Sequence, residues 1–230
     1  RNQPRPQLEL LGLIARLRNG LGDYREALQV LRRQEESFRR LDGPLPPELV
    51  LESAIEHARA LRALGQPRDC VETLLPARRV ADANAGTRSI LVAEYYAQLG
   101  RCHRLLGERD QARALFQRSL ELRRAARGGG VEEAESLSDL ALLQADAGAV
   151  DEAVAGLRLA LDRLRVATGE RHPLGVTIWR SLGGLHRQRS EVAQAEGAYR
   201  QAMDIALSLY GSQHPATIEV QRQLGALLVD

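Results

Sequence analysis

The sequence contains no lysine, so all 32 of its Lys and Arg residues are arginine. Aromatic residues make up only 3%, there are two cysteines, and no apolar run approaches the roughly 18 residues that a membrane span needs. Alternating β-branched segments with Asn-Gly turns, which are typical of strands and hairpins, are nearly absent. These absences argue against a membrane domain, a disulfide framework and a β-sheet protein. We therefore expect an all-α fold.

Sequence signatures of enzymes are also missing. There is no Gly-rich phosphate loop ending in Lys, no His-Glu-x-x-His, no Cys-x-x-Cys and no Gly-x-Ser-x-Gly. A formal net charge of +2 and the lack of interleaved aromatic residues argue against nucleic-acid binding. We expect a non-catalytic protein with no cofactor, no metal and no inserted membrane segment.

What the chain does contain is an internal repeat. Gly169-Glu-Arg-His-Pro173 and Gly211-Ser-Gln-His-Pro215 lie 42 residues apart. Five segments of similar length each carry a small residue in their first half and another one 12 positions later. The first members are Ala15, Ala58, Gly100, Ala141 and Gly183, and the second members are Ala27, Cys70, Ala112, Ala153 and Ala195.

Each segment is predicted to form two amphipathic helices that approach closely at the small residues. Large residues four positions after the second small site would fill the space between repeats, namely Leu31, Leu74, Phe116, Leu157 and Tyr199. The turns inside four repeats carry Gly22, Gly65, Gly107 and Gly148, where a helix ends in a left-handed residue. The fifth repeat has Ser190 there, and we expect a strained turn. We expect His172 and His214, each before a proline, to be turn residues.

The pattern Trp179-x2-Leu182-Gly183-x2-His186, followed by Ala195-x3-Tyr199, resembles the tetratricopeptide repeat family. The length of about 42 residues resembles the kinesin-light-chain type, found in bacterial multidomain signalling proteins. The resemblance implies a right-handed superhelical solenoid of stacked antiparallel helix pairs, about 11 helices in one domain over residues 1–230. The expected repeats are 7–47, 48–89, 90–130, 131–173 and 174–215, with a terminal helix at 216–230. The second repeat matches the family pattern least well, because it carries His57 and Cys70 at positions usually held by Leu and Ala. We therefore expect its local structure to be irregular. Gly128–Gly130 is predicted to be a flexible joint.

The resemblance also implies a concave groove lined by the first helix of each pair. Arginines recur on these helices beside carboxylates, and Tyr95 is a further candidate for contact with a partner. The candidate arginines and glutamates are Arg16, Arg59, Arg62, Arg101, Arg104, Arg180, Arg187, Glu52 and Glu94. One hypothesis is an arginine ladder that binds an acidic peptide or its C-terminal carboxylate. The other is a salt-bridged polar face in which the glutamates neutralise the arginines. Residues 1–115 carry a net charge of +4, so an acidic partner is expected on the first three repeats.

Other chemically suggestive residues have structural interpretations that we favour. His57, His103 and His186 are expected to be packed or hydrogen-bonded. Trp179, Tyr95 and Tyr96 are expected to be packing residues, with the groove as the alternative for Tyr95. Cys70 and Cys102 lie in adjacent repeats; we favour buried packing residues over a disulfide, which stays an alternative.

The predicted function is a protein or peptide interaction module. The resemblance suggests the sensory or partner-binding region of a larger bacterial protein, such as a Ser/Thr kinase or regulator. The chain starts at Arg1 rather than Met, so we expect a piece of something longer. Alternatives are a scaffold that forms a homodimer through Leu224–Val229, and the docking arm of an enzyme. A cytoplasmic location is favoured over a periplasmic sensor module.

Overall fold

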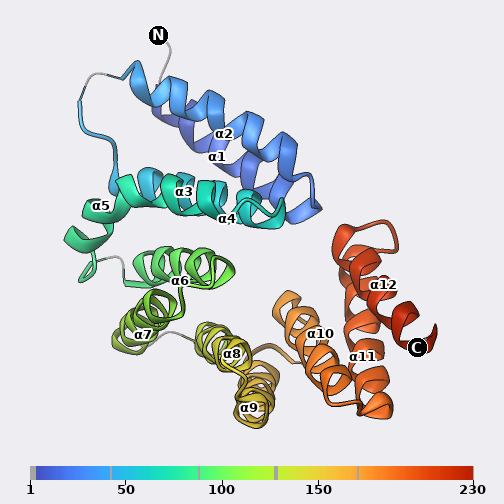
Figure 1. The fold of residues 1–230 in the computed structure, drawn as a ribbon. Coiled ribbons are helices and arrows are strands. Elements are labelled where there is room, and N and C mark those ends of the chain that lie inside the picture. Colours follow the sequence, from blue (N-terminus) through green and yellow to red (C-terminus); the bar gives the residue numbers. More distant parts are fainter. Residues whose placement is uncertain (1–3, 42, 88, 127–128, 170, 230) are drawn as a thin grey trace. The chain divides into compact units, whose positions relative to one another are not determined.

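The computed structural model describes residues 4–41, 43–87, 89–126, 129–169 and 171–229, and its regular structure there is entirely helical. The chain divides into two compact units, Arg1–Ala126 and Arg127–Asp230, which we call the N-terminal and C-terminal units and describe separately (Figure 1). The expected all-α fold of stacked helix pairs is confirmed. The assignment of residues 1–230 to one domain stays a prediction.

The N-terminal unit holds the first three repeats. Its elements are α1 (Pro4–Leu21), α2 (Tyr24–Arg39), α3 (Pro47–Ala63), α4 (Pro67–Leu74), the 3-10 helix η1 (Leu75–Ala77), α5 (Arg78–Ala83), α6 (Ser89–Leu105) and α7 (Arg109–Ala125). Helices α1 and α2 form one pair and α6 and α7 another, while α3 packs on α4, α1 and α6. If α4, η1 and α5 are taken as one interrupted helix, the described residues contain eleven helical segments, as predicted.

The C-terminal unit holds the last two repeats and the terminal helix. Its elements are α8 (Gly130–Asp146), α9 (Val150–Thr168), α10 (Pro173–Gln188), α11 (Val192–Tyr210) and α12 (Pro215–Val229). Helices α8 and α9 form one pair and α10 and α11 the next; α10 also contacts α9, and α12 packs on α11.

The small residues 12 positions apart are all buried where the two helices of a repeat approach. At Gly183 a Cβ atom would lie 2.6 Å from the Tyr199 ring, and at Gly100 it would lie 2.7 Å from the Phe116 ring. Real Cβ atoms do not come this close, so both positions require glycine. The large residues that were predicted to fill the space between repeats are buried as well.

The turns inside the repeats follow the predicted pattern. Gly22, Gly65, Gly107 and Gly148 have φ between 72° and 84°. Ser190 takes the same conformation with φ 59°, and it is the one non-glycine residue with positive φ among those that the structure describes. A side chain is disfavoured in this region, so the expected strain at the fifth turn is confirmed.

The joints between the later repeats end one helix and start the next within five residues. Gly169 ends α9 with φ 79°, and His172 caps α10 with Nδ1 accepting a hydrogen bond from the Leu174 N–H at 3.1 Å. His214 accepts from the Ala216 N–H at the same distance. Burial lowers the pKa of His172, partly opposed by Glu135, which suits a neutral ring whose Nδ1 accepts a hydrogen bond. Of the predicted joint at 128–130, Gly128 lies outside the described residues.

The second repeat is irregular, as expected, but for another reason. Its second helix breaks at η1, where Pro76 stands in what would be the helix interior. Proline lacks the N–H and its ring clashes with the preceding turn, which interrupts the helix. His57 and Cys70, the residues on which the expectation rested, lie inside regular helix.

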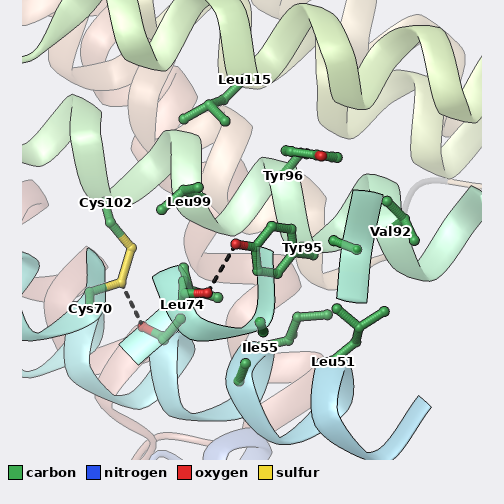
Figure 2. Packing of buried hydrophobic residues seen from close by; sticks show 14 of the residues in the cluster. Leu51, Ile55, Cys70, Leu74, Val92, Tyr95, Tyr96, Leu99, Cys102 and Leu115 are labelled. Carbon is green, nitrogen blue, oxygen red and sulfur yellow. Dashed lines mark hydrogen bonds between the residues drawn. A yellow bond between two sulfur atoms is a disulfide. The ribbon is translucent and has the colours of Figure 1, made fainter. Parts of the chain in front are cut away.

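The core of the N-terminal unit is built around Tyr95, which is fully buried (Figure 2). Its hydroxyl donates to the Leu74 carbonyl oxygen at 3.0 Å, and its ring packs edge-on against Tyr96. Burial raises the pKa of Tyr95 and, together with a hydrogen bond to Asp82, raises the pKa of Tyr96 to about 12. Both phenols are therefore neutral, and both residues are buried in the packing, as expected.

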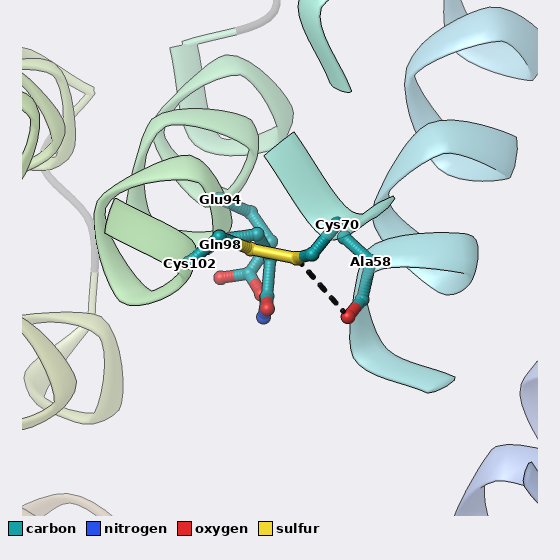
Figure 3. The surroundings of a disulfide bond; sticks show 5 residues. All are labelled: Ala58, Cys70, Glu94, Gln98 and Cys102. Carbon is teal, nitrogen blue, oxygen red and sulfur yellow. Dashed lines mark hydrogen bonds between the residues drawn. A yellow bond between two sulfur atoms is a disulfide. The ribbon is translucent and has the colours of Figure 1, made fainter. Parts of the chain in front are cut away.

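Cys70 and Cys102 form a disulfide between α4 and α6, with their Cα atoms 6.0 Å apart (Figure 3). Both residues are fully buried, as expected of small packing residues. The favoured interpretation, however, left them unbonded and was wrong. The bond forms because Cys70 of the second repeat and Cys102 of the third lie where α4 packs on α6, a proximity that spacing along the chain does not reveal.

Candidate functional site

The predicted arginines of the N-terminal unit lie in a network of ion pairs. Arg16 of α1 lies 3.4 Å from both Glu52 and Glu56 of α3. Arg59 of α3 lies 3.4 Å from Glu56 and 2.8 Å from Glu94 of α6. The network thus runs from α1 across α3 to α6, alternating in charge at each step.

Glu94 is the centre of this network. It accepts hydrogen bonds from Arg59 at 2.8 Å, from Gln98 at 2.8 Å and from Arg123 of α7 at 2.9 Å, and Arg101 lies 3.9 Å away. The Arg123 side chain is only 3% exposed, so this carboxylate compensates a buried guanidinium. Figure 3 shows Glu94 and Gln98 on α6, beside the disulfide.

These contacts favour the salt-bridged face over the arginine ladder in the first three repeats. The guanidinium groups of Arg16, Arg59 and Arg101 each have a carboxylate of the same unit within 4.0 Å. A partner's carboxylate would have to compete with these internal partners. Glu56 and Arg123 were not among the residues predicted for this surface. Glu56 could have been predicted, because it lies four residues after Glu52 on the same helix face.

Tyr95 does not face a binding surface. It is fully buried with its hydroxyl bonded to Leu74, so the expectation that it lines a groove was wrong. On a helix, neighbouring residues point about 100° apart, and Glu94 takes the outward position instead. Arg62 and Arg104 are half-buried on α3 and α6.

A second group of predicted residues meets in the C-terminal unit. Arg180 and Arg187 of α10 and Arg222 of α12 line a hollow of ≈ 310 Å³ between these helices. The remaining lining residues are Ser181, Gly184, Tyr199, Gln223 and Ala226. Arg180 and Arg187 lie seven residues apart, which places them on one face of α10, two turns from each other.

The arginines of this hollow differ in how they are neutralised. Arg222 makes two hydrogen bonds to Glu219, at 3.0 and 2.9 Å. Neither Arg180 nor Arg187 has a carboxylate within ion-pair distance among the residues that the structure describes. Two guanidinium groups therefore face the hollow without a carboxylate within 4.0 Å among the described residues, unlike Arg16, Arg59 and Arg101.

The polar groups at the hollow respond to this positive charge. Burial raises the pKa of the Tyr199 hydroxyl, and the nearby Arg187 and Arg180 partly offset the shift. The hydrogen bond from Arg222 holds the pKa of Glu219 below its ordinary value, helped by the charges of Arg222 and Arg180. The Tyr199 hydroxyl has no hydrogen-bond partner within the described ranges. The hollow thus offers two guanidinium groups and a phenol to an anion.

The described residues show neither a metal site nor a membrane span. They contain no group of three or more His, Cys, Asp or Glu placed to hold a metal ion. Within the same ranges, no helix is both long and apolar enough to cross a membrane. His103 and His186 hydrogen-bond to Glu108 and Glu191 at equivalent turns, as expected of structural histidines.

The pattern of a tetratricopeptide repeat matches residues 49–125, 132–208 and 176–230. The chain belongs to the tetratricopeptide repeat family. Tetratricopeptide repeats bind proteins and peptides and are typically non-catalytic. No curated protein matches the sequence of this chain.

Solved tetratricopeptide structures share the fold. BtubC (BKLC) from P. vanneervenii is 17% identical, with a TM-score of 0.61 over 91% of this chain and 82% of that chain. A putative kinesin light chain from Podosopora anserina is 23% identical, with a TM-score of 0.57 over 90% of this chain and 98% of that one. NprR, solved in complex with its cognate peptide NprX, is 14% identical, with a TM-score of 0.69 over 96% of this chain and 61% of that one. The expected kinesin-light-chain likeness is confirmed at the level of fold.

Proposed function

We propose that this tetratricopeptide domain binds a peptide segment of a partner and holds its carboxylate between α10 and α12. The observation that carries the proposal is the pair Arg180 and Arg187, which lie on one hollow without an ion-pair partner in the described part of the chain. Guanidinium groups form paired hydrogen bonds to carboxylates, which gives both affinity and orientation. The partner site is thus proposed for the last repeats, not for the first three as the charge distribution suggested.

The size of the hollow suits one terminal residue or one acidic side chain. At ≈ 310 Å³ it lies at the lower end of the range for small-ligand pockets. Arg222 is already neutralised by Glu219, so Arg180 and Arg187 carry the recognition and Tyr199 adds a hydroxyl donor. NprR shows a peptide bound to a protein of this fold, which is consistent with a peptide ligand here.

We place this binding activity in a larger bacterial signalling protein, such as a Ser/Thr kinase or a regulator. This setting rests on the likeness to long repeats of the kinesin-light-chain type. Binding would then be the sensory or recruiting step, and an effector domain elsewhere in the protein would perform the reaction.

The test is a fluorescence-polarisation screen of a random peptide library with free C-terminal carboxylates. Peptides that bind are titrated against the wild type, the double variant Arg180→Ala with Arg187→Ala, and the control Arg200→Ala. Arg200 is exposed and pairs with Glu196 of its own helix, outside the hollow. We expect the double variant to weaken binding about tenfold or more, and the control to leave it unchanged. Equal affinity for the wild type and the double variant would overturn the proposal.

Self-association is a second candidate function, and α1 supplies its observation. Leu10, Leu13, Leu17 and Leu21 form an exposed stripe along this helix, each more than half exposed. The positions equivalent to Leu10 in the third and fifth repeats, Tyr95 and Ile178, are fully buried. Of the dimer surface predicted from the sequence, Leu227 is buried against the last full repeat and Leu224 is partly buried, while Leu228 is exposed. The test is the molar mass of the wild type and of Leu13→Glu, measured by light scattering at several concentrations. A wild type that stays monomeric at every concentration would reject self-association.

A further inference from the structure

A groove that none of the predicted site residues lines runs between α9 and α11 in the C-terminal unit. It consists of two hollows, of ≈ 580 and ≈ 370 Å³, which share Arg158, Trp179 and Gln201. These helices are the second members of their pairs, whereas the hollow of Arg180 and Arg187 lies between α10 and α12. The groove is therefore a separate surface of the same unit.

The indole of Trp179 forms the floor of the groove, and the equivalent residue of the third repeat is buried. Trp179 occupies the position that Tyr96 takes in the third repeat, four residues before the small site. Tyr96 is 3% exposed, and its hydroxyl bonds to Asp82 of the preceding repeat. Trp179 is partly exposed, and its N–H has no acceptor in the described ranges. Tryptophan N–H groups usually find a partner when packed, so this indole is open to a ligand.

The far wall of the groove is open because α11 presents small residues. A Cβ atom built at Gly197 meets nothing within 4 Å, and Ala198 follows it along the wall. Glycine in a helix interior costs stability, since alanine would hold the backbone better. At Gly100 and Gly183 a ring explains the glycine, but at Gly197 no contact does. Its effect is to leave room over Trp179.

The charge at the junction of the two hollows is cationic. Among the described residues, Arg158 is the charged residue that lines both hollows. No carboxylate lies within ion-pair distance of it in this part of the chain. Asp162 and Asp204 line only the larger hollow, together with Arg165 and Arg171. The junction thus combines an aromatic face, a guanidinium group and the Gln201 amide.

We propose that this groove is a second peptide-binding site, for a segment in which an aromatic side chain is followed by an acidic one. The aromatic ring would stack on Trp179, the adjacent carboxylate would pair with Arg158, and Gln201 would hydrogen-bond the peptide backbone. The proposal does not depend on the carboxylate site of α10 and α12, because the two share no lining residue.

The chain has one tryptophan, and Trp179 lines this groove and not the hollow of Arg180 and Arg187, so its emission reports on the groove. The probe is the doubly blocked peptide acetyl-Gly-Phe-Asp-Gly-amide, which has no terminal charge. We expect saturable change of the Trp179 emission at millimolar peptide. We expect about tenfold weaker binding of the Phe-Asn and Ala-Asp versions of the peptide. A Trp179 emission that none of the peptides changes would overturn the proposal.

Variants locate the binding. Arg158→Ala removes the charge, and Gly197→Leu adds a bulky side chain at a position where a Cβ atom meets nothing within 4 Å. Both variants are expected to bind the Phe-Asp peptide about tenfold more weakly. The matched control is Arg163→Ala, an exposed arginine of the same helix that does not line the groove. Arg180→Ala with Arg187→Ala should leave this titration unchanged, which separates the two sites. Wild-type affinity in both Arg158→Ala and Gly197→Leu would reject the groove as the binding site.

Discussion

Arg59 of α3 donates a hydrogen bond to Glu94 of α6 at 2.8 Å, and so joins the first helices of two successive repeats. The two residues are 35 positions apart in the chain. The same carboxylate also receives the buried Arg123 of α7. An arginine that looks like part of a binding surface in the sequence is thus a structural link between repeats.

Replacing Glu94 with Gln should therefore destabilise the N-terminal unit. The variant removes a charged acceptor shared by Arg59, Gln98 and Arg123, and we expect the free energy of unfolding to fall by roughly 2–4 kcal/mol. Urea denaturation followed by circular dichroism measures the change. Glu9→Gln is the control, because the exposed Glu9 pairs within the described residues with Arg5, one turn away on α1, at 3.1 Å. Its effect should stay below about 0.5 kcal/mol. Similar losses in the two variants would contradict this account.

Replacing two glycines of the C-terminal unit by alanine should change the free energy of unfolding in opposite directions. At Gly183 the new methyl group would lie 2.6 Å from the Tyr199 ring, so overpacking should lower the free energy of unfolding by about 1–2 kcal/mol. At Gly197 it meets nothing within 4 Å, so the better helix propensity of alanine should raise stability by roughly 0.5–1 kcal/mol. Denaturant midpoints of the two variants test the pair. A stabilised Gly183→Ala protein would show that this helix contact is looser than described.

The disulfide should make the stability of the chain depend on redox conditions. Cys70 and Cys102 are 32 residues apart, and removing a cross-link of this length costs roughly 3–4 kcal/mol in the chain-entropy account. We expect wild-type protein that was reduced in denaturant and refolded with reductant to melt at lower temperature than oxidised protein. Cys70→Ala with Cys102→Ala should melt at one temperature in both conditions. Identical melting of oxidised and reduced wild type argues against the bond.

His57 should make stability fall in mild acid. Burial holds the pKa of His57 below its ordinary value of 6.5, opposed by Glu35, whose carboxylate lies 3.5 Å from Nε2, and reinforced by Arg32. Protons therefore bind the unfolded chain more readily than the folded one. The contribution of neutral His57 to the free energy of unfolding is therefore fully present above about pH 6.5. It is lost as the pH falls through the lowered pKa of His57 in the folded protein.

His57→Leu should flatten that part of the pH dependence. Leucine stands at the equivalent position in the third and fifth repeats, as Leu99 and Leu182, so the fold accepts it there. Thermal unfolding of the variant and the wild type between about pH 7 and about pH 5 gives the comparison. His172, whose pKa is also lowered, contributes equally to both proteins and cancels in the difference. Parallel curves for the two proteins would assign the acid sensitivity to other groups.

The sequence by itself determined the repeat and its local geometry. Small residues 12 positions apart, glycines at the turns and Gly-x-x-His-Pro at the joints each act within one helix pair or one turn. Their consequences, such as the positive φ of Ser190 and the capping by His172, follow from nearest-neighbour sterics and hydrogen bonding. The break at Pro76 was equally local and could have been predicted from the missing N–H of proline.

Only the tertiary structure decided which side chains are available to a partner. Arg16 and Arg180 look alike in the sequence, yet Arg16 pairs with Glu52 and Glu56 from a neighbouring helix, while Arg180 makes no ion pair within 4.0 Å in the described residues. Such pairing depends on residues about 30 to 40 positions away and on helix rotation, where one residue along the chain turns a side chain by about 100°. The same rotation buries Tyr95 and leaves Trp179 open, because the helix that would cover the indole carries Gly197 at that point.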